Sequence, residues 1–221
     1  ARAQPGHRIV DVIFGALAPA CPARIIAAGN GANTSAAFFG QGADGRYYVY
    51  LETLGGGSGG RAYKDGVDGV QVHMTNTSNL PIEALETEYP LMVERYELVP
   101  DTGGAGRHRG GLGIRRDYRP IGHATTFSGQ GERFAHPPWG LFGGEPGGTG
   151  RFAVIADDGT QTRLSNKPSA LKVGPDAVVS VITPGAGGYG APGDRTGADL
   201  ARDRESGKFS ADWLARQYRN R

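Results

Sequence analysis

Short runs in which apolar and polar residues alternate recur along the chain, and segments rich in glycine and proline separate them. Alternation with a period of two is typical of strands that bury one face. Two Asp-Gly steps, Asp44-Gly45 and Asp158-Gly159, stand between such runs and predict hairpin turns. The predicted strand segments are residues 24–28, 36–39, 46–54, 70–75, 92–99, 114–118, 123–128, 151–164 (as a hairpin) and 177–183.

Two segments in the first half of the chain have helical character. The apolar residues between Val10 and Leu17 suit a buried or amphipathic helix that stops near the prolines at positions 19 and 22. Residues 81–86 begin with proline and carry acidic residues near the positive end of the helix dipole, as a first helical turn does. We expect Asn79 in the N-cap region of that helix.

The composition becomes more polar after Gly190, and the last part of the chain is helix-forming. Residues 199–205 and 210–218 predict two helices, the second of them capped by Ser210. No internal repeat and no linker divide the chain into independent domains. The sequence therefore predicts an α+β fold: a strand-rich unit with short helices and long glycine-rich loops over residues 1–190, followed by a helical tail over residues 191–221.

Glycine is the outlier of the composition, with 38 of 221 residues where about 7% is usual. The glycines cluster between runs rich in valine, isoleucine, tyrosine and phenylalanine. We therefore expect tight loops that join strands rather than a disordered chain.

Charge and cysteine content exclude several classes of protein. Basic and acidic residues number 24 and 22, so nothing favours a nucleic-acid partner or a membrane surface. No apolar run has the length of a membrane span, and the first residues lack the apolar core of a signal peptide. Cys21 is the single cysteine, so we expect no internal disulfide, a small buried side chain at this position, and a cytoplasmic protein.

The segment Gly55–Gly60 follows a tyrosine-rich strand and leads to Asp65 and Asp68, each of which precedes a glycine. A flexible linker is an alternative, but this setting favours a structured loop that faces a ligand or an interface. The segment lacks the Gly-x-x-x-x-Gly-Lys pattern of a phosphate loop, and the chain has no dinucleotide-binding glycine pattern at the right spacing. Ser58 lacks the strand-to-helix setting of a nucleophile elbow.

The two aspartates, with His73 and Asn76 shortly after them, supply the groups that proton transfer needs. The alternative, which the residues alone favour, is that the Asp-Gly pairs make turns and that Glu83 and Glu86 stabilise a helix start. Metal ligands at the usual spacings are absent, because the histidines are scattered and no His-x-His or His-Glu-x-x-His occurs. We therefore expect no metal site in this chain.

Several motifs follow one another in a fixed order over nearly the whole chain. They are Val10-Asp11-Val12 with Cys21-Pro22, the loop 55–68, Asn79-x-Pro81-Ile82-Glu83-x-x-Glu86, Asp101-Thr102-Gly103-Gly104 with Arg109-Gly110-Gly111, Gly140-Leu141-Phe142-Gly143-Gly144, and Thr183-Pro184-Gly185-x-Gly187-Gly188-Tyr189-Gly190. In order and spacing this set resembles the hydantoinase B/oxoprolinase family.

The resemblance implies an enzyme that works in a complex. Family members are subunits, or C-terminal halves, of ATP-dependent cyclic amidases and of acetone or acetophenone carboxylases. An A-type partner binds ATP with Mg and phosphorylates the substrate, and the B-type protein completes the reaction. B-type proteins are usually more than twice as long as this chain, with a metal motif in the N-terminal half. The resemblance therefore implies two partners, the A-type subunit and the remaining N-terminal part of the B-type subunit, and a possible divalent metal in that part.

The expected function is the C-terminal part of a B-type subunit of a cyclic-amide hydrolase that acts on a small molecule. The alternatives are a subunit of a ketone carboxylase and a non-catalytic assembly module. In the first case Asp65 or Asp68 would serve as general base or orient water, His73 would shuttle a proton, and Arg109 would hold developing negative charge. The residues expected to contact substrate are Gly56, Gly57, Ser58, Asn76, Glu83, Glu86 and Asp101.

Overall fold

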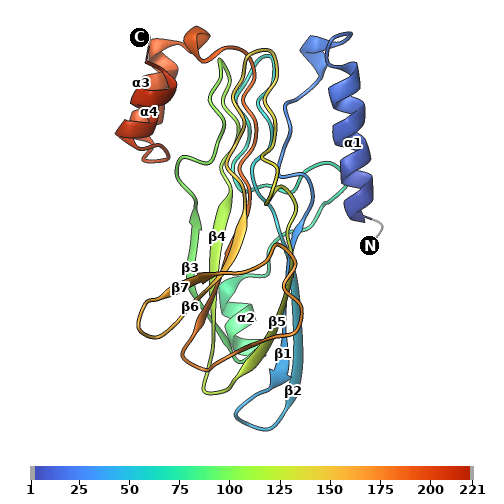
Figure 1. Ribbon diagram of the computed structural model, residues 1–221, viewed down its shortest axis with the longest axis vertical. Coiled ribbons are helices and arrows are strands. Elements are labelled where there is room, and N and C mark those ends of the chain that lie inside the picture. The colour runs from blue at the N-terminus through green and yellow to red at the C-terminus, as the bar shows by residue number, and fades with distance from the viewer. Residues whose placement is uncertain (1–2, 220–221) are drawn as a thin grey trace.

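The helices, except the one at residues 82–88, lie apart from the strands in this computed structural model, which describes residues 3–219 (Figure 1). The helices are α1 (Ala3–Leu17), α2 (Ile82–Glu88), α3 (Gly197–Glu205) and α4 (Ala211–Gln217), and the short 3-10 turns are η1 (Pro22–Arg24) and η2 (Pro192–Asp194). The strands are β1 (Thr34–Gln41), β2 (Tyr47–Leu54), β3 (Leu91–Leu98), β4 (Ile114–Pro120), β5 (Thr125–Gln130), β6 (Arg151–Ile155), β7 (Gln161–Arg163), β8 (Leu171–Val173) and β9 (Val178–Ile182).

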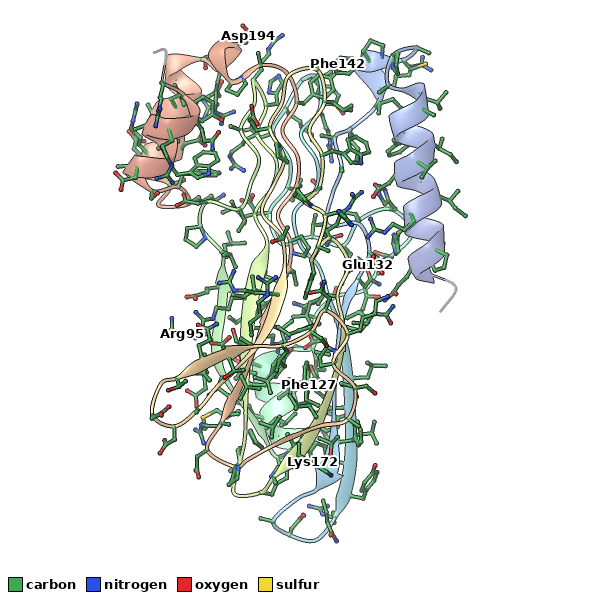
Figure 2. The ribbon with its side chains drawn as sticks, viewed as in Figure 1. Arg95, Phe127, Glu132, Phe142, Lys172 and Asp194 are labelled. Carbon is green, nitrogen blue, oxygen red and sulfur yellow. The ribbon has the colours of Figure 1, made fainter. Side chains whose placement is uncertain are left out.

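The strands form two antiparallel sheets whose inner faces share one apolar core. One sheet has the order β2-β1-β5-β8, and the other has the order β3-β4-β9-β6-β7. Phe38 of β1 packs on Tyr118 of β4 with ring centroids 4.8 Å apart, and on Phe127 of β5 at 5.1 Å. Phe127 is labelled in Figure 2. Leu85 of α2 is fully buried in the same core.

Strand β2 shows how the alternating pattern produces a sheet with one buried face. Its inward residues are Tyr48, Tyr50, Glu52 and Leu54. Its exposed outward residues are Tyr47, Val49 and Leu51. The register of β2 against β1 runs from Thr34 opposite Leu54 to Gln41 opposite Tyr47, so this face is kept along the whole strand.

A buried ion pair lies inside this otherwise apolar core. The Arg116 side chain is fully buried, and its Nη1 donates to Glu52 Oε1 at 2.6 Å. The hydroxyl groups of Tyr118 (2.7 Å) and Tyr50 donate to Glu52 Oε2, and the Leu80 amide donates to Oε1. Burial, followed by the Glu52 charge, raises the pKa of both tyrosines, so both hydroxyl groups remain protonated donors.

The glycine-rich segments do more than turn the chain. They run side by side as a bundle of extended segments that form no regular sheet (Figure 1). We call residues 25–31, 55–69, 101–113, 138–150 and 183–190 the glycine bundle. Backbone hydrogen bonds join its segments, for example from Gly57 N to Pro184 O (3.0 Å), Gly111 N to Ser58 O (2.9 Å) and Gly104 N to Ala186 O (2.7 Å). The expectation of tight loops between strands is therefore wrong for these segments. They pack on one another as a second unit, separate from the two sheets.

Close approach of backbones explains why glycine fills the bundle. A Cβ at Gly59 would lie 1.8 Å from the Ala27 carbonyl oxygen, and one at Gly185 would lie 1.9 Å from that of Thr102. Neither glycine has a positive φ, so the requirement is space rather than backbone conformation.

Helices cover opposite sides of the glycine bundle (Figure 1). α3 and α4 pack on one side through a second apolar cluster that includes Leu112, Leu200 and Trp213. Ser210 caps α4 as expected, because its Oγ accepts from the Trp213 amide at 3.1 Å. α1 lies on the other side. In residues 3–219 no helix is both long and apolar enough to cross a membrane.

The α+β fold and most predicted elements are confirmed. Both hairpin turns form, and the predicted helices at 10–17, 81–86, 199–205 and 210–218 are present. Asn79 is not the cap of α2: Pro81 holds that position, and the Asn79 amide donates to the Tyr96 hydroxyl. Strand β8, with three residues, was not predicted.

Three further predictions are wrong. Residues 24–28 form no strand, because the amides of Ala27 and Ala28 bond to two different segments, at Gly60 and Trp139. Residues 70–75 form no strand, because a single bridge joins Val70 to Gly56 and the chain then turns at His73, where φ is 55°. Cys21 is exposed rather than buried, since it lies in the turn that ends α1.

Candidate functional site

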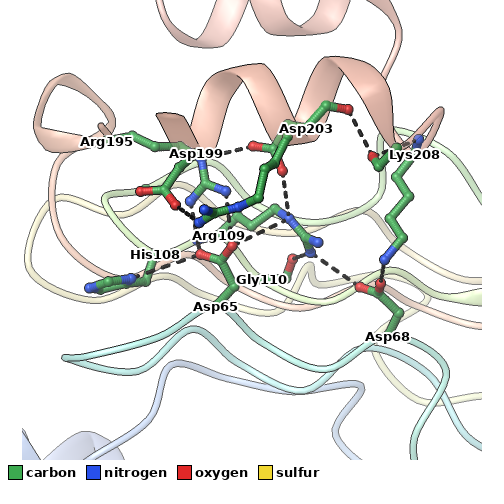
Figure 3. A network of polar contacts seen from close by, with 12 residues as sticks. Asp65, Asp68, His108, Arg109, Gly110, Arg195, Asp199, Asp203 and Lys208 are labelled. Atoms are coloured by element: carbon green, nitrogen blue, oxygen red, sulfur yellow. Dashed lines mark hydrogen bonds and ion pairs between the residues drawn. The ribbon is translucent and has the colours of Figure 1, made fainter. Parts of the chain in front are cut away.

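Charged residues from three parts of the chain meet where α3 packs on the glycine bundle (Figure 3). We call them the junction cluster: Asp65, Asp68, Arg109, Arg195, Asp203 and Lys208. Arg195 binds Asp65 through two parallel bonds of 2.8 and 2.9 Å, and its Nε donates to Asp203 at 2.8 Å. Arg109 lies between the carboxylates of Asp68 and Asp203, at 3.2 Å from each. Lys208 completes the set at 2.7 Å from Asp68.

The junction cluster keeps its carboxylates ionised. Burial alone would raise the pKa of Asp65, but Arg195 and Arg109 outweigh it and hold the pKa below its ordinary value. Burial is likewise outweighed at Asp68, where bonds from Lys208 and the Leu112 amide and the charge of Arg109 lower the pKa. A carboxylate with a lowered pKa and occupied oxygens is a weak proton acceptor. This geometry favours a bracing function for the cluster.

The stability of the fold is expected to depend on pH through these two aspartates. Their folded-state pKa lies below that of an unfolded aspartate, about 3.9, so the stabilisation is complete above that pH and is lost as the pH falls through the folded values. Urea unfolding between about pH 2 and 6 should show this loss, and Asp65→Asn with Asp68→Asn should flatten it. An unchanged pH slope in the double variant would contradict the assignment.

The predicted loop residues Gly56, Gly57 and Ser58 lie inside the glycine bundle and are buried. Ser58 Oγ accepts from the Val67 amide at 2.7 Å and so holds the turn that carries both aspartates. Asp101 also has a bracing position, since it accepts from the amide and hydroxyl of Ser210, each at 2.7 Å.

An open groove of about 560 Å³ lies between the first turn of α2, the segment before it and β3. Glu83 lines it, together with Asn79, Tyr96 and Gln71. Gln71 donates to the Thr53 carbonyl at 3.0 Å, while its own Oε1 is buried without a partner. The groove thus combines a carboxylate with uncharged polar groups and suits a small polar molecule.

Two other residues predicted to contact substrate lie outside this groove. Glu86 accepts from the Val93 amide at 2.9 Å and lines a second groove, of about 510 Å³, beside the β1–β2 turn. Asn76 is exposed on the segment that leads to α2.

His73 lies apart from the junction cluster and contacts α1. Its Nε2 donates to Asp11 Oδ1 at 2.9 Å, and Arg133 donates to the other oxygen of Asp11 at 2.7 Å. His73 and Arg133 both adopt positive φ, 55° and 57°. Two strained residues therefore hold one carboxylate, an arrangement common at functional sites.

A second histidine lies beside this pair. His7 and His73 have ring centroids 5.9 Å apart. Because the Thr75 hydroxyl donates to Asn33 at 3.1 Å, His7 Nε2 is the donor in its 2.9 Å bond to Thr75, and His7 Nδ1 is left without a partner. Burial, then the neighbouring His73, lowers the pKa of His7. His7 is therefore neutral, and we call Asp11, His73, Arg133, His7 and Thr75 the α1 cluster.

The structure brings Asp65, Asp68 and Arg109 together, and it places His73 with other partners. Among the described residues, no hydrogen bond or ion pair joins His73 to these three. The sequence analysis did not single out the partners that complete the two clusters: Asp11, Arg133, Arg195, Asp203 and Lys208. Of these residues, only Asp11 belongs to a motif noted in the sequence, Val10-Asp11-Val12.

Within residues 3–219, no group of three or more histidine, cysteine, aspartate or glutamate side chains could hold a metal ion. Asp11 is the carboxylate nearest to His73, and a guanidinium already occupies its second oxygen.

Comparison with known proteins gives a consistent result. The model of the family described as hydantoinase B/oxoprolinase matches residues 1–192. An uncharacterized protein of Methanocaldococcus jannaschii is 43% identical over 216 residues, which cover 98% of this chain and 37% of that protein. 5-Oxoprolinase 1 of Arabidopsis thaliana is 36% identical over 144 residues, which cover 65% of this chain and 11% of that protein.

A similar fold occurs in a solved structure. The crystal structure of an ATP-dependent caprolactamase from Pseudomonas jessenii matches with a TM-score of 0.80 and 26% identity, over 92% of this chain and 36% of that chain. Caprolactamase subunit beta of the same organism is 37% identical over 142 residues, which cover 62% of this chain and 24% of the subunit. The chain thus spans about a third or less of the length of these relatives.

Proposed function

Because the chain belongs to the hydantoinase B/oxoprolinase family, we propose that it is the C-terminal part of a B-type subunit in an ATP-dependent enzyme that opens cyclic amides. One observation carries the proposal: the relatives with named activities, a 5-oxoprolinase and a caprolactamase, have names that denote cyclic amides. The structural similarity to the caprolactamase covers 92% of this chain.

An A-type partner would supply ATP with Mg and activate the amide by phosphorylation. An amide is a poor electrophile, and phosphorylation of its carbonyl oxygen creates a good leaving group. A divalent metal in the N-terminal half of the B-type subunit would have to find its ligands there, since the described residues of this chain form no such group.

The groove at Glu83 is the proposed substrate-binding surface of this chain. A cyclic amide presents one N–H donor and one carbonyl acceptor on adjacent atoms. The Glu83 carboxylate can accept from the N–H, and the amide or hydroxyl groups of Asn79 and Ser78 can donate to the carbonyl. The volume of about 560 Å³ lies within the range of small-molecule sites.

His73 is the proposed proton shuttle. Asp11 accepts from its Nε2, so Nδ1 is the ring nitrogen that would act as the base. Asp11 would stabilise the imidazolium that forms when this nitrogen takes a proton from water. The water oxygen would bond to the activated carbon, and the C–N bond of the amide ring would break as the imidazolium returns the proton to the departing amine. A second water would then cleave the resulting acyl phosphate into carboxylate and phosphate. Asp65, Asp68 and Arg109 brace the fold in this proposal.

Substitution of His73 tests this assignment in the complete B-type subunit with its A-type partner. We expect His73→Gln to lower kcat by about 10²-fold or more, with little change in KM, because a general base acts in the transition state. His136→Gln is the matched control, since His136 is exposed, and it should keep full turnover. Retained turnover in His73→Gln would contradict the assignment, and a loss confined to Asp65→Asn and Asp68→Asn would support a catalytic junction cluster instead.

Substitution of Glu83 tests the groove separately. Glu83→Gln replaces the carboxylate with a neutral amide of the same shape, so we expect KM for the cyclic amide to rise about tenfold with a smaller effect on kcat. Glu88→Gln, on the exposed end of the same helix, is the control. Equal KM values for both variants would exclude Glu83 from substrate binding.

A further inference from the structure

Helix α1 has its polarity reversed relative to an ordinary surface helix. Its buried side chains include the polar His7 and Asp11, which contact Thr75, His73 and Arg133. Its outward positions are aliphatic and exposed: Ile9 (59%), Val12 (70%), Ile13 (47%) and Leu17 (45%). A surface helix normally buries the apolar stripe and exposes the polar one.

The polar inner face is fixed by specific contacts. Asp11 is bound by His73 and Arg133, and His7 is bound by Thr75. Rotation of the helix to bury its aliphatic residues would break all of these bonds. These bonds therefore fix the orientation of α1. We call the exposed residues Ile9, Val12, Ile13 and Leu17 the α1 stripe. Only a contact from outside the described chain can cover it.

The α1 stripe is continuous on the helix surface and uncovered. Its members are spaced three, four and eight residues from Ile9, so they form one side of the helix. α1 lies at the edge of the molecule, and no other element of the described chain packs on its outer side (Figure 1). Contiguous exposed apolar surface of this kind marks a site of protein interaction.

A second set of exposed apolar side chains lies on β2. β2 is the edge strand of its sheet, and its outward residues Tyr47 (70%), Val49 (57%) and Leu51 (64%) are exposed. An uncovered edge strand with apolar side chains is normally paired or covered in a finished protein.

We propose that the α1 stripe is the surface on which the rest of the B-type subunit docks. The length of the relatives identifies this occupant. The caprolactamase match covers 92% of this chain but 36% of that chain, so most of the caprolactamase chain lies outside the matched part. The inference rests on the proposed B-type function. Since the opposite face of α1 holds Asp11 against His73, the docked polypeptide would also fix the position of the proton shuttle.

Site-directed photo-crosslinking tests the proposal in the complete B-type subunit assembled with its A-type partner. p-Benzoyl-phenylalanine is placed at Val12, and at Ile9 in a second variant, and crosslinked peptides are identified by mass spectrometry. We expect crosslinks to B-type peptides outside residues 1–221. The control position is Arg204, exposed on α3 on the other side of the bundle, which should give none of these crosslinks.

Three outcomes would overturn the proposal: crosslinks from positions 9 and 12 to a second copy of this chain, crosslinks to the A-type partner, or none at either position. The readout requires no turnover. An assembly that crosslinks as expected but opens no cyclic amide would overturn the proposed function and leave the docking surface in place.

Discussion

Gly110→Ala is expected to prevent the glycine bundle from forming. A Cβ at this position would lie 1.9 Å from the carbonyl oxygen of Ala186 and 2.5 Å from its carbon, and backbone atoms cannot move aside as a flexible side chain can. Gly110 also donates to Gly104 at 2.9 Å, and Gly104 donates to Ala186, so a shift of one segment breaks bonds in the others. We expect a loss of more than about 4 kcal/mol in the free energy of unfolding.

Gly174→Ala is the matched control for this prediction. No atom lies within 4 Å of a Cβ at Gly174, and its φ is not positive. Urea unfolding should therefore show a change within about 0.5 kcal/mol, or a slight gain from the reduced freedom of the unfolded chain. Equal unfolding midpoints for the two variants would contradict the claim that close backbone contact, rather than loop flexibility, explains the glycine content.

Removal of Arg116 is the second change with a large expected effect. Arg116→Met leaves the buried Glu52 carboxylate with two tyrosine hydroxyls but without its cation, so we expect a loss of about 3–5 kcal/mol. The double variant with Glu52→Gln removes the charge as well as its partner. The double variant should recover much of the lost free energy of unfolding. Replacing both members of a buried ion pair destabilises a protein far less than removing one member and leaving the other charge unpaired.

Denaturant unfolding of the two single variants and the double variant, arranged as a cycle, measures the coupling. We expect the double variant to be more stable than Arg116→Met alone. Additive losses would show that Glu52 and Arg116 do not act as a pair. The exposed pair of Arg46 and Asp44, at 2.6 Å, provides a control in which the same cycle should give little coupling.

The local pattern of the sequence was sufficient for most of the fold. Alternation predicts β2 because this strand buries one face, and the run Val178–Ile182 predicts a buried strand because β9 lies between two neighbours. β8 escaped prediction because three residues carry too little periodicity. The segment 70–75 alternates like a strand, but its polar residues His73 and Thr75 form hydrogen bonds with residues of α1 instead of facing solvent from a sheet.

The candidate sites depend on contacts that a single sequence does not contain. His73 and Asp11 are 62 positions apart, and Asp65 and Arg195 are 130 positions apart. The aspartates of the first loop were recognisable as chemistry-bearing residues, but two of their cations, Arg195 and Lys208, come from parts of the C-terminal tail that lie outside its predicted helices. Glycine content signalled an unusual region, whereas the bundle became visible only from the approach of one backbone to another.

Coupled turnover is the most direct test of the central claim. The complete B-type subunit and its A-type partner are supplied with ATP and, in turn, with hydantoin, 5-oxoproline and caprolactam, and phosphate release and ring-opened product are measured together. We predict that one of these amides is opened with one phosphate released per ring, and that neither forms without ATP. Phosphate release driven by acetone with bicarbonate, with no opening of any cyclic amide, would contradict the account.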